Sequence, residues 1–272
     1  MAETKYTFCR ICEATCGLAV QVEDNRVRKI EPDREHVVSE GFVCVKGTHF
    51  DEVQNSPDRV TAPLKRVGDR WQEITWDQAA AEIGEKLKAL RARHGGGSIA
   101  HFVGSPAGAN VLSPMFRSAF FKALGSNRMY GTPTTDTTNK FRVNEDMYGS
   151  PFRLAFPDVN HTRFLMVIGA NPAVSGNTLY HLPRARSRMG DIVKRGGRVV
   201  FINPRRVESA AVGEHDFIRP DTDLYFLAAV LNEMSLAGHV DPSVVADHGR
   251  GVELLRDAVD GWTAERQEPV TG

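Results

Sequence analysis

The chain has 272 residues, and 34 lysines and arginines balance 34 aspartates and glutamates, so its formal net charge at pH 7 is zero. Charged residues make up 25% and apolar residues 41% of the chain, which is ordinary for globular proteins and excludes a disordered tail, a collagen-like fibre and a disulfide-dense miniprotein. The balanced charge gives no electrostatic reason to bind nucleic acid or an anionic membrane surface, and no apolar run approaches the roughly 18–20 residues of a membrane-spanning helix.

The N-terminus carries no recognisable export signal. Residues 1–6 contain no basic segment followed by an apolar one, and no pair of arginines precedes the first cysteine. We therefore expect a cytoplasmic protein, in which cysteines stay reduced.

All four cysteines fall within the first 44 residues, as a close group of Cys9, Cys12 and Cys16 followed by the distant Cys44. Thiolates clustered in this way are typical of the ligands of a [4Fe–4S] cluster. Two alternatives remain: a structural zinc site, which more often uses two separated cysteine pairs, and two disulfides, which a reducing compartment disfavours. Gly17 permits the positive φ that a tight loop around a cluster needs.

Short alternating apolar stretches over residues 5–60 predict a small β-rich unit, and the prolines and turn-forming residues at 55–63 mark its end. A helix is expected to begin at Thr75, which forms a capping box with Gln78, and to stop at the glycines 95–97. Two further elements are expected after it, a strand over 98–103 and a helix over 113–124.

A second α/β unit is indicated later in the chain. Residues 164–168 and 198–202 are continuous apolar runs, as expected for strands buried on both faces of a parallel sheet. A helical pattern over 181–195 lies between them, so the three segments predict a right-handed β–α–β crossover. A further helix follows, capped by Asp221 or Thr222. The expected fold class is α/β, with a small β-rich domain ahead of Rossmann-like parallel sheets.

Polar segments follow the two predicted strands. The first strand leads into Gly169–Ser175 and the second into Asn203–Arg206, while Arg219–Asp223 opens the last helix. Ligands of open α/β sheets bind beyond the carboxyl ends of the strands, and arginines and helix N-termini bind phosphate, so these segments indicate a nucleotide with a pyrophosphate. Ordinary turns with solvated arginines are the alternative. Neither the NAD-binding glycine fingerprint nor a P-loop is present.

Together these motifs resemble the N-terminal half of the molybdopterin oxidoreductase superfamily, which includes formate dehydrogenases, nitrate reductases and dimethyl sulfoxide reductase relatives. The resemblance covers essentially the whole chain. It implies a cluster domain over residues 1–61, the first part of an α/β domain over 62–138, and an incomplete molybdopterin-guanine-dinucleotide-binding domain over 139–272. The similar motifs are Cys9–Gly17 and Gly41–Gly47 for the [4Fe–4S] cluster, Gly169–Pro172 for G-x-N-P, Asn203–Arg206 for (D/N)-P-R-R, and Arg219–Asp223 for R-P-G-T-D.

The resemblance also implies a role for each matching residue. The cluster ligands would be Cys9, Cys12, Cys16 and Cys44, and Lys46 would relay electrons between the cluster and the pterin. The cofactor would be a bis(molybdopterin guanine dinucleotide) carrying molybdenum or tungsten. One of its guanine-dinucleotide arms would be lined by Gly169, Asn171, Pro172, Ser175, Asn203, Arg205, Arg219, Thr222 and Asp223.

Two departures from the family pattern concern this site. Asp221 replaces the usual glycine of the R-P-G-T-D motif, which adds a carboxylate close to the expected pyrophosphate or guanine. Family members often supply a Cys, selenocysteine, Ser or Asp ligand to the metal, whereas alignment places Asn144 at that position here. Asp146 is chemically the better ligand. A few family members leave the metal without a protein ligand, so a metal with no protein ligand is the alternative. A formate dehydrogenase of the cysteine or selenocysteine type is therefore disfavoured.

Three functions follow as hypotheses. The leading one is a molybdenum or tungsten bis-pterin oxidoreductase that performs two-electron or oxygen-atom transfer on a small substrate and passes electrons through the cluster to an external carrier, a ferredoxin or a quinone- or NAD-linked subunit. The second is an incomplete, catalytically inactive subunit that binds cluster and cofactor, because the resemblance implies a missing C-terminal half. The third is a zinc-stabilised module that binds a free nucleotide.

Overall fold

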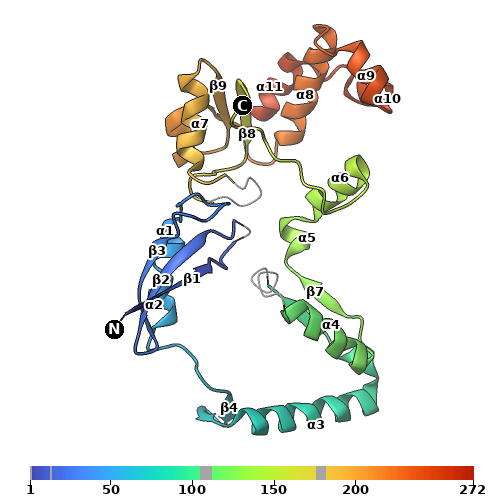
Figure 1. Cartoon of the computed structure of the whole chain (residues 1–272). Coiled ribbons are helices and arrows are strands. Elements are labelled where there is room, and N and C mark those ends of the chain that lie inside the picture. The colour runs from blue at the N-terminus through green and yellow to red at the C-terminus, as the bar shows by residue number, and fades with distance from the viewer. Residues whose placement is uncertain (1, 13, 105–111, 176–181) are drawn as a thin grey trace. The chain divides into compact units, whose positions relative to one another are not determined.

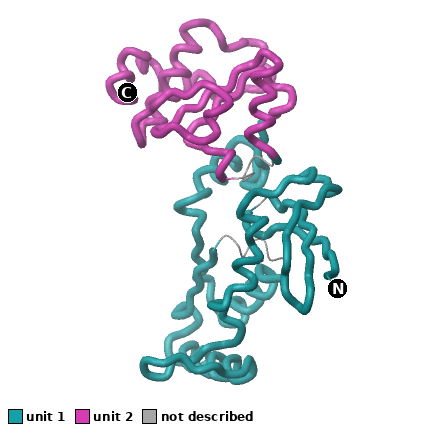
Figure 2. The backbone as a smooth tube through the Cα atoms, turned by 90° about the vertical axis from the view of Figure 1, so that its left-hand side faces the viewer, with its two compact units in different colours: residues 1–157, 176–183 teal, residues 158–175, 184–272 magenta. Residues whose placement is uncertain are grey.

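The computed structural model describes residues 2–12, 14–104, 112–175 and 182–272 (Figure 1). The chain separates into two compact units, coloured differently in Figure 2. Unit 1 contains residues 1–157 and 176–183, and unit 2 contains residues 158–175 and 184–272.

Unit 1 opens with a three-stranded antiparallel sheet in the order β1-β2-β3, as the alternating apolar pattern predicts. Alternate residues of β2, Leu18 and Val20, are buried together with Ile30 of β3, and these side chains form the core of this part. Two short helices contact β3. The elements are β1 (Glu3–Phe8), β2 (Gly17–Glu23), β3 (Arg26–Pro32), α1 (Val45–Thr48) and α2 (Phe50–Gln54).

The remainder of unit 1 contains an antiparallel hairpin, a long helix and a pair of short parallel strands, β6 and β7. The predicted strand after residue 98 and the predicted helix near 113–124 are both confirmed. The elements are β4 (Leu64–Val67), β5 (Arg70–Glu73), α3 (Trp76–His94), η1 (Gly96–Ser98), β6 (His101–Val103), α4 (Leu112–Leu124), β7 (Met129–Gly131), α5 (Pro133–Asp136) and α6 (Thr138–Tyr148).

Half of the predicted capping box at α3 is present. Thr75 caps the helix, since its Oγ1 accepts a hydrogen bond from the Gln78 amide at 3.1 Å. The reciprocal bond was predicted wrongly, because the Gln78 side chain instead donates to Glu82 Oε1 at 2.9 Å. That carboxylate also binds Lys65 and is a charged acceptor one turn along the helix. The helix ends at Gly95, which has a φ of 75°.

Unit 2 is built on a parallel sheet in the order β10-β9-β8, which consists of β8 (Phe164–Ile168), β9 (Arg198–Ile202) and β10 (Glu214–Asp216). The bounds of β8 and β9 match the predicted strands, and the two strands are parallel with a helix between them, so the β–α–β unit is confirmed. Strand β9 is buried as expected, whereas Phe164 and Met166 of β8 are exposed, so the expected burial of β8 on both faces was wrong. The helix of the β–α–β unit, α7 (Ala185–Lys194), begins four residues later than predicted, and residues 176–181 lie outside the described part. Met189, Ile192 and Phe201 are fully buried and form the contact between α7 and the sheet.

Four helices complete unit 2: α8 (Asp223–Leu236), α9 (Pro242–His248), α10 (Val252–Val259) and α11 (Ala264–Thr271). Both α10 and α11 pack against α8. Thr222 is the N-cap residue of α8, but its side chain makes no capping bond, because Oγ1 donates to the Arg219 carbonyl at 2.7 Å. No helix within the described ranges is long and apolar enough to cross a membrane.

Candidate functional site

The first candidate site is the loop that connects β1 to β2. Cys9, Cys12 and Cys16 all lie in this loop, and a hydrogen bond from the Cys9 amide to the Cys16 carbonyl closes it at 2.8 Å. Cys9 and Cys16 are buried, and Cys12 packs against the same core. Cys44 is the N-cap residue of α1. Among the residues that the structure describes, no three His, Cys, Asp or Glu side chains are close enough together to hold a single metal ion.

The four thiols are nevertheless close enough to perturb one another. Burial, and then the neighbouring thiols of Cys12, Cys9 and Cys44, raise the pKa of Cys16 to about 11. Burial also raises the pKa of Cys9, while the charge of Lys46 acts in the lowering direction. Buried thiolates require nearby positive charge, which bound iron supplies. The chemistry of this donor set therefore fits an iron–sulfur cluster.

Two glycines make the packing around this loop tight. A Cβ atom at Gly47 would collide with Val43 and lie 3.6 Å from the Cys9 sulfur, and one at Gly17 would overlap the His36 side chain. Gly17 lies in β2 and does not have the positive φ that we predicted, so that prediction was wrong. Space against the His36 ring, rather than backbone handedness, is the reason for glycine at this position.

The second candidate site lies at the carboxyl edge of the sheet in unit 2. Because β8, β9 and β10 are parallel neighbours, the segments that follow them start at the same edge. These segments are residues 169–175, 203–208 and 217–223. The strand β10 was not predicted, and it is the strand that carries the third segment to this edge.

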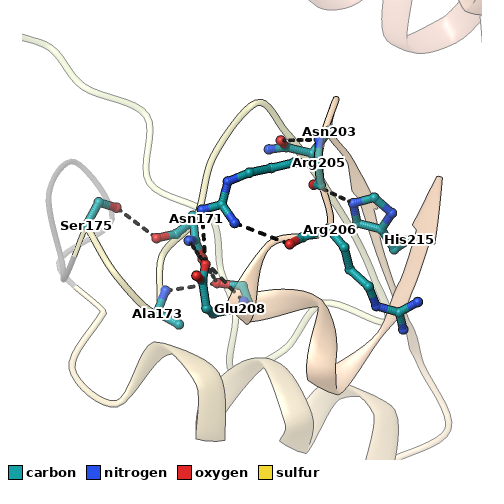
Figure 3. A network of polar contacts seen from close by, with 9 residues as sticks. Asn171, Ala173, Ser175, Asn203, Arg205, Arg206, Glu208 and His215 are labelled. Carbon is teal, nitrogen blue, oxygen red and sulfur yellow. Dashed lines mark hydrogen bonds and ion pairs between the residues drawn. The ribbon is translucent and has the colours of Figure 1, made fainter. Parts of the chain in front are cut away.

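Asn171 joins the first segment to the second (Figure 3). Its Oδ1 accepts hydrogen bonds from the Ser209 amide at 3.2 Å and the Ser209 hydroxyl at 2.7 Å, and its Nδ2 donates to Glu208 Oε2 at 2.5 Å. The Ser209 hydroxyl accepts from the Ala173 amide at 2.9 Å. Ser175 Oγ donates to the Asn171 carbonyl at 3.1 Å. These bonds fix the shape of the segment that Gly169 begins and in which Pro172 is buried.

Arg205 and Glu208 form an ion pair in the second segment, with 3.2 Å between Nη2 and Oε2. Arg205 Nη1 also donates to the Arg206 carbonyl at 3.3 Å, and the buried Asn203 accepts the Arg205 amide at 3.4 Å. A backbone hydrogen bond, and then Arg205 and Asn171, hold the pKa of Glu208 below its usual range. Glu208 was missed in the sequence, although its position three residues after an arginine was a signal for such a pair.

Arg219, in the third segment, is directed toward the end of α11. Its amide donates to the Thr271 carbonyl at 2.8 Å, and its Nη1 donates to the Pro269 carbonyl. A cation at a helix C-terminus is favoured by the helix dipole. Thr222 and Asp223 lie at the start of α8, and Asp221 adopts a left-handed conformation with a φ of 65°.

The predicted metal-ligand region lies on α6 in unit 1. Asn144 is buried, and its Nδ2 donates to the Pro151 carbonyl at 3.5 Å. Asp146 is exposed and forms an ion pair with Arg142, with 3.0 Å between Oδ1 and Nη2. Both residues thus lie on a regular helix. Lys46 is exposed on α1, two residues after Cys44.

Two family models match the chain. Residues 2–56 match the family model described as "Molybdopterin oxidoreductase Fe4S4 domain", and residues 59–260 match the model described as "Molybdopterin oxidoreductase". The chain belongs to the molybdopterin oxidoreductase family. The descriptions of the two models name an Fe4S4 domain and molybdopterin, so the predicted cofactors, a [4Fe–4S] cluster and molybdopterin, are confirmed.

Individual relatives agree with this assignment. The chain is 28% identical to a nitrate reductase of Symbiobacterium thermophilum, over 98% of this chain and 36% of the relative. It is 25% identical to the F420-dependent formate dehydrogenase subunit alpha of Methanocaldococcus jannaschii, over 98% of this chain and 38% of the relative. The chain thus spans little more than a third of these relatives' length.

A solved structure supports the fold. Acetylene hydratase from Pelobacter acetylenicus superposes with a TM-score of 0.81 at 24% identity, over 98% of this chain and 37% of that structure. The predicted α/β fold class, with its small N-terminal cluster domain, is confirmed.

Proposed function

We propose that this chain is the cluster-carrying and nucleotide-binding part of a molybdenum or tungsten bis-pterin oxidoreductase that acts on a small substrate. The observation that carries the proposal is the edge of the unit 2 sheet, where three polar segments follow three parallel strands. Two of these segments are linked by the network around Asn171 and Arg205. Such an edge suits a ligand with a pyrophosphate group.

The residues of unit 1 serve electron transfer in this proposal. Cys9, Cys12, Cys16 and Cys44 hold the cluster through their sulfur atoms. Lys46 is assigned as the electron relay, since its charge already acts on Cys9 and it follows the fourth cysteine by two residues. The electron acceptor is an external carrier, such as a ferredoxin or a quinone- or NAD-linked subunit.

The residues of unit 2 bind one guanine-dinucleotide arm. Arg205 supplies N–H donors to the pyrophosphate, since a guanidinium binds phosphate oxygens in a fork. Thr222 and Asp223, at the N-terminus of α8, serve the same arm, where Asp223 can accept hydrogen bonds from a guanine edge. The backbone shape that receives this arm is set by Gly169 and Pro172 and by three residues whose side chains are engaged in hydrogen bonds, namely Asn171, Ser175 and Asn203.

When bound, the molybdenum or tungsten centre supplies two-electron or oxygen-atom transfer. Asn144 and Asp146 form the assigned metal-ligand region. Of the two, Asp146 is the better donor, and its carboxylate would have to leave Arg142 to bind the metal. Arg219 is assigned to the arm through its segment, although its guanidinium contacts α11.

The test is anaerobic purification of the full chain followed by metal and pterin analysis. We expect about four irons per chain with broad visible absorbance, together with molybdenum or tungsten and a pterin guanine dinucleotide. Colourless protein that contains one zinc and no pterin would contradict the proposal and support a zinc-stabilised nucleotide-binding module.

A second candidate is a subunit that binds the cluster and half of the cofactor but is inactive without a C-terminal half. The observation that favours it is coverage, because the chain spans 36% of the nitrate reductase relative. Reduction or oxidation of a viologen dye distinguishes the two candidates. Turnover by this chain alone supports the enzyme, whereas turnover only after addition of a C-terminal half supports the subunit.

A further inference from the structure

Glu208 lies at the junction of two segments that carry family motifs. Its Oε2 accepts a hydrogen bond from Asn171, in the segment after β8, and another from Arg205, in the segment after β9 (Figure 3). The distances are 2.5 Å and 3.2 Å. A single carboxylate oxygen therefore couples two side chains that come from different strands of the sheet.

Stability of the fold does not account for this carboxylate. The side chains of Arg205 and Glu208 are 61% and 56% exposed. Exposed ion pairs of this kind contribute little to folding, because solvent screens them and two long side chains must be ordered. The contact instead determines where the Arg205 guanidinium is held.

The arrangement leaves Arg205 able to bind a further anion. A guanidinium has five N–H donors, and the contacts with Glu208 and the Arg206 carbonyl use one donor on each terminal nitrogen. Donors therefore remain for phosphate oxygens while the side chain stays fixed. An arginine that is already ordered does not have to lose its rotamer freedom when a ligand arrives.

We propose that Glu208 is a positioning residue of the nucleotide site, which holds the Arg205 guanidinium and the Asn171 amide in the arrangement that receives a pyrophosphate. The inference rests on the proposed function, because it takes a pyrophosphate-bearing nucleotide as the ligand of this sheet edge. Glu208 acts through Arg205 and Asn171 and is not assigned a contact with the ligand.

Titration calorimetry of the full chain with GDP tests this role through three substitutions. Glu208→Ala removes both contacts, and we expect GDP affinity to fall by about threefold to tenfold, the effect of freeing one long side chain. Glu208→Asp keeps the charge but shortens the reach by one methylene, so a similar loss is expected. Glu208→Gln offers an amide oxygen to the same donors and should retain affinity within about twofold.

The matched control is Glu214→Ala. Glu214 is exposed and paired with Arg198 at the amino ends of β9 and β10, the opposite edge of the same sheet. This variant should bind GDP as the parent chain does, and its unfolding temperature should match that of Glu208→Ala.

The outcomes separate the inference from the function on which it rests. Equal or tighter GDP binding by Glu208→Ala overturns the inference, and tighter binding by both the Ala and Gln variants would show that the carboxylate competes with phosphate. Arg205→Ala tests the site itself. If the parent chain binds no GDP, or if Arg205→Ala binds it equally well, the nucleotide site is wrong and the inference fails with it. If Arg205→Ala weakens binding and Glu208→Ala does not, only the inference fails.

Discussion

The hydroxyl of Ser209 connects two segments of the sheet edge, and its removal has a predictable cost. Ser209 has no exposed surface, and its hydroxyl donates to Asn171 and accepts from the Ala173 amide. Ser209→Ala removes both bonds. Asn171 keeps its bond from the Ser209 amide, whereas the Ala173 amide loses its acceptor.

The expected magnitude follows from the two hydrogen bonds that the Ser209 hydroxyl makes, because Ala173 is exposed and water can reach its amide after the substitution. Each such bond contributes about 0.5–1.5 kcal/mol, so we expect the free energy of unfolding of unit 2 to fall by about 1–3 kcal/mol. For a domain of roughly a hundred residues, each kcal/mol lowers the unfolding temperature by about 4–8 °C. Scanning calorimetry measures this shift, and hydrogen exchange detected by mass spectrometry should show faster exchange in the peptide that contains Ala173.

Ser187→Ala is the control, because it also deletes a serine hydroxyl but does so at an exposed position on α7. Its effect should stay within about 0.5 kcal/mol. An unchanged unfolding temperature and unchanged exchange at Ala173 in Ser209→Ala would refute the reasoning, since the hydroxyl would then not be the acceptor that holds the segment.

Three further predictions concern single residues. Asp221→Gly relieves a left-handed conformation, so it should raise the free energy of unfolding by about 0.5–1 kcal/mol, and calorimetry that shows a loss would contradict this. A hydrogen bond from Arg198 holds the pKa of Glu214 below its usual range. The pair's contribution is therefore present above the unfolded pKa and lost as pH falls through the lower folded value. The difference in unfolding temperature between the parent and Glu214→Gln should vanish well below about pH 4, and persistence there would be evidence against the pair. Cys44→Ala removes one thiolate and leaves no donor atom in its place, so iron analysis should fall below about four atoms per chain; a full complement would exclude Cys44 as a ligand.

The sequence predicts the bounds of β8 and β9 but does not predict strand β10. Both predicted strands are continuous apolar runs, although only β9, the middle strand of the sheet, is buried along most of its length. Strand β10 consists of Glu214, His215 and Asp216. These residues form a strand because they pair with β9. That pairing is a long-range interaction that no local pattern of polar residues encodes.

For the candidate site too, the sequence predicts one part and misses another. The motif residues can be found from their types and order, but their contacts cannot. Asn171 and Ser209 are 38 residues apart, and Arg219 reaches a carbonyl 50 residues further along the chain. Such partners depend on how strands and helices meet in space, and single-sequence patterns carry that information only for neighbours within a few residues.

Two arginine–glutamate pairs lie at opposite edges of the unit 2 sheet. They show that geometry, and not residue type, decides whether the arginine can also bind an anion. Arg198 binds Glu214 through two parallel hydrogen bonds, Nε to Oε1 at 2.9 Å and Nη2 to Oε2 at 2.7 Å. That fork commits a whole edge of the guanidinium, so a phosphate would have to displace the carboxylate. Arg205 meets Glu208 through one nitrogen and one oxygen only. It can therefore stay anchored while its remaining donors bind an anion, and this pair is the one located at the carboxyl edge of the strands, where the family motifs converge.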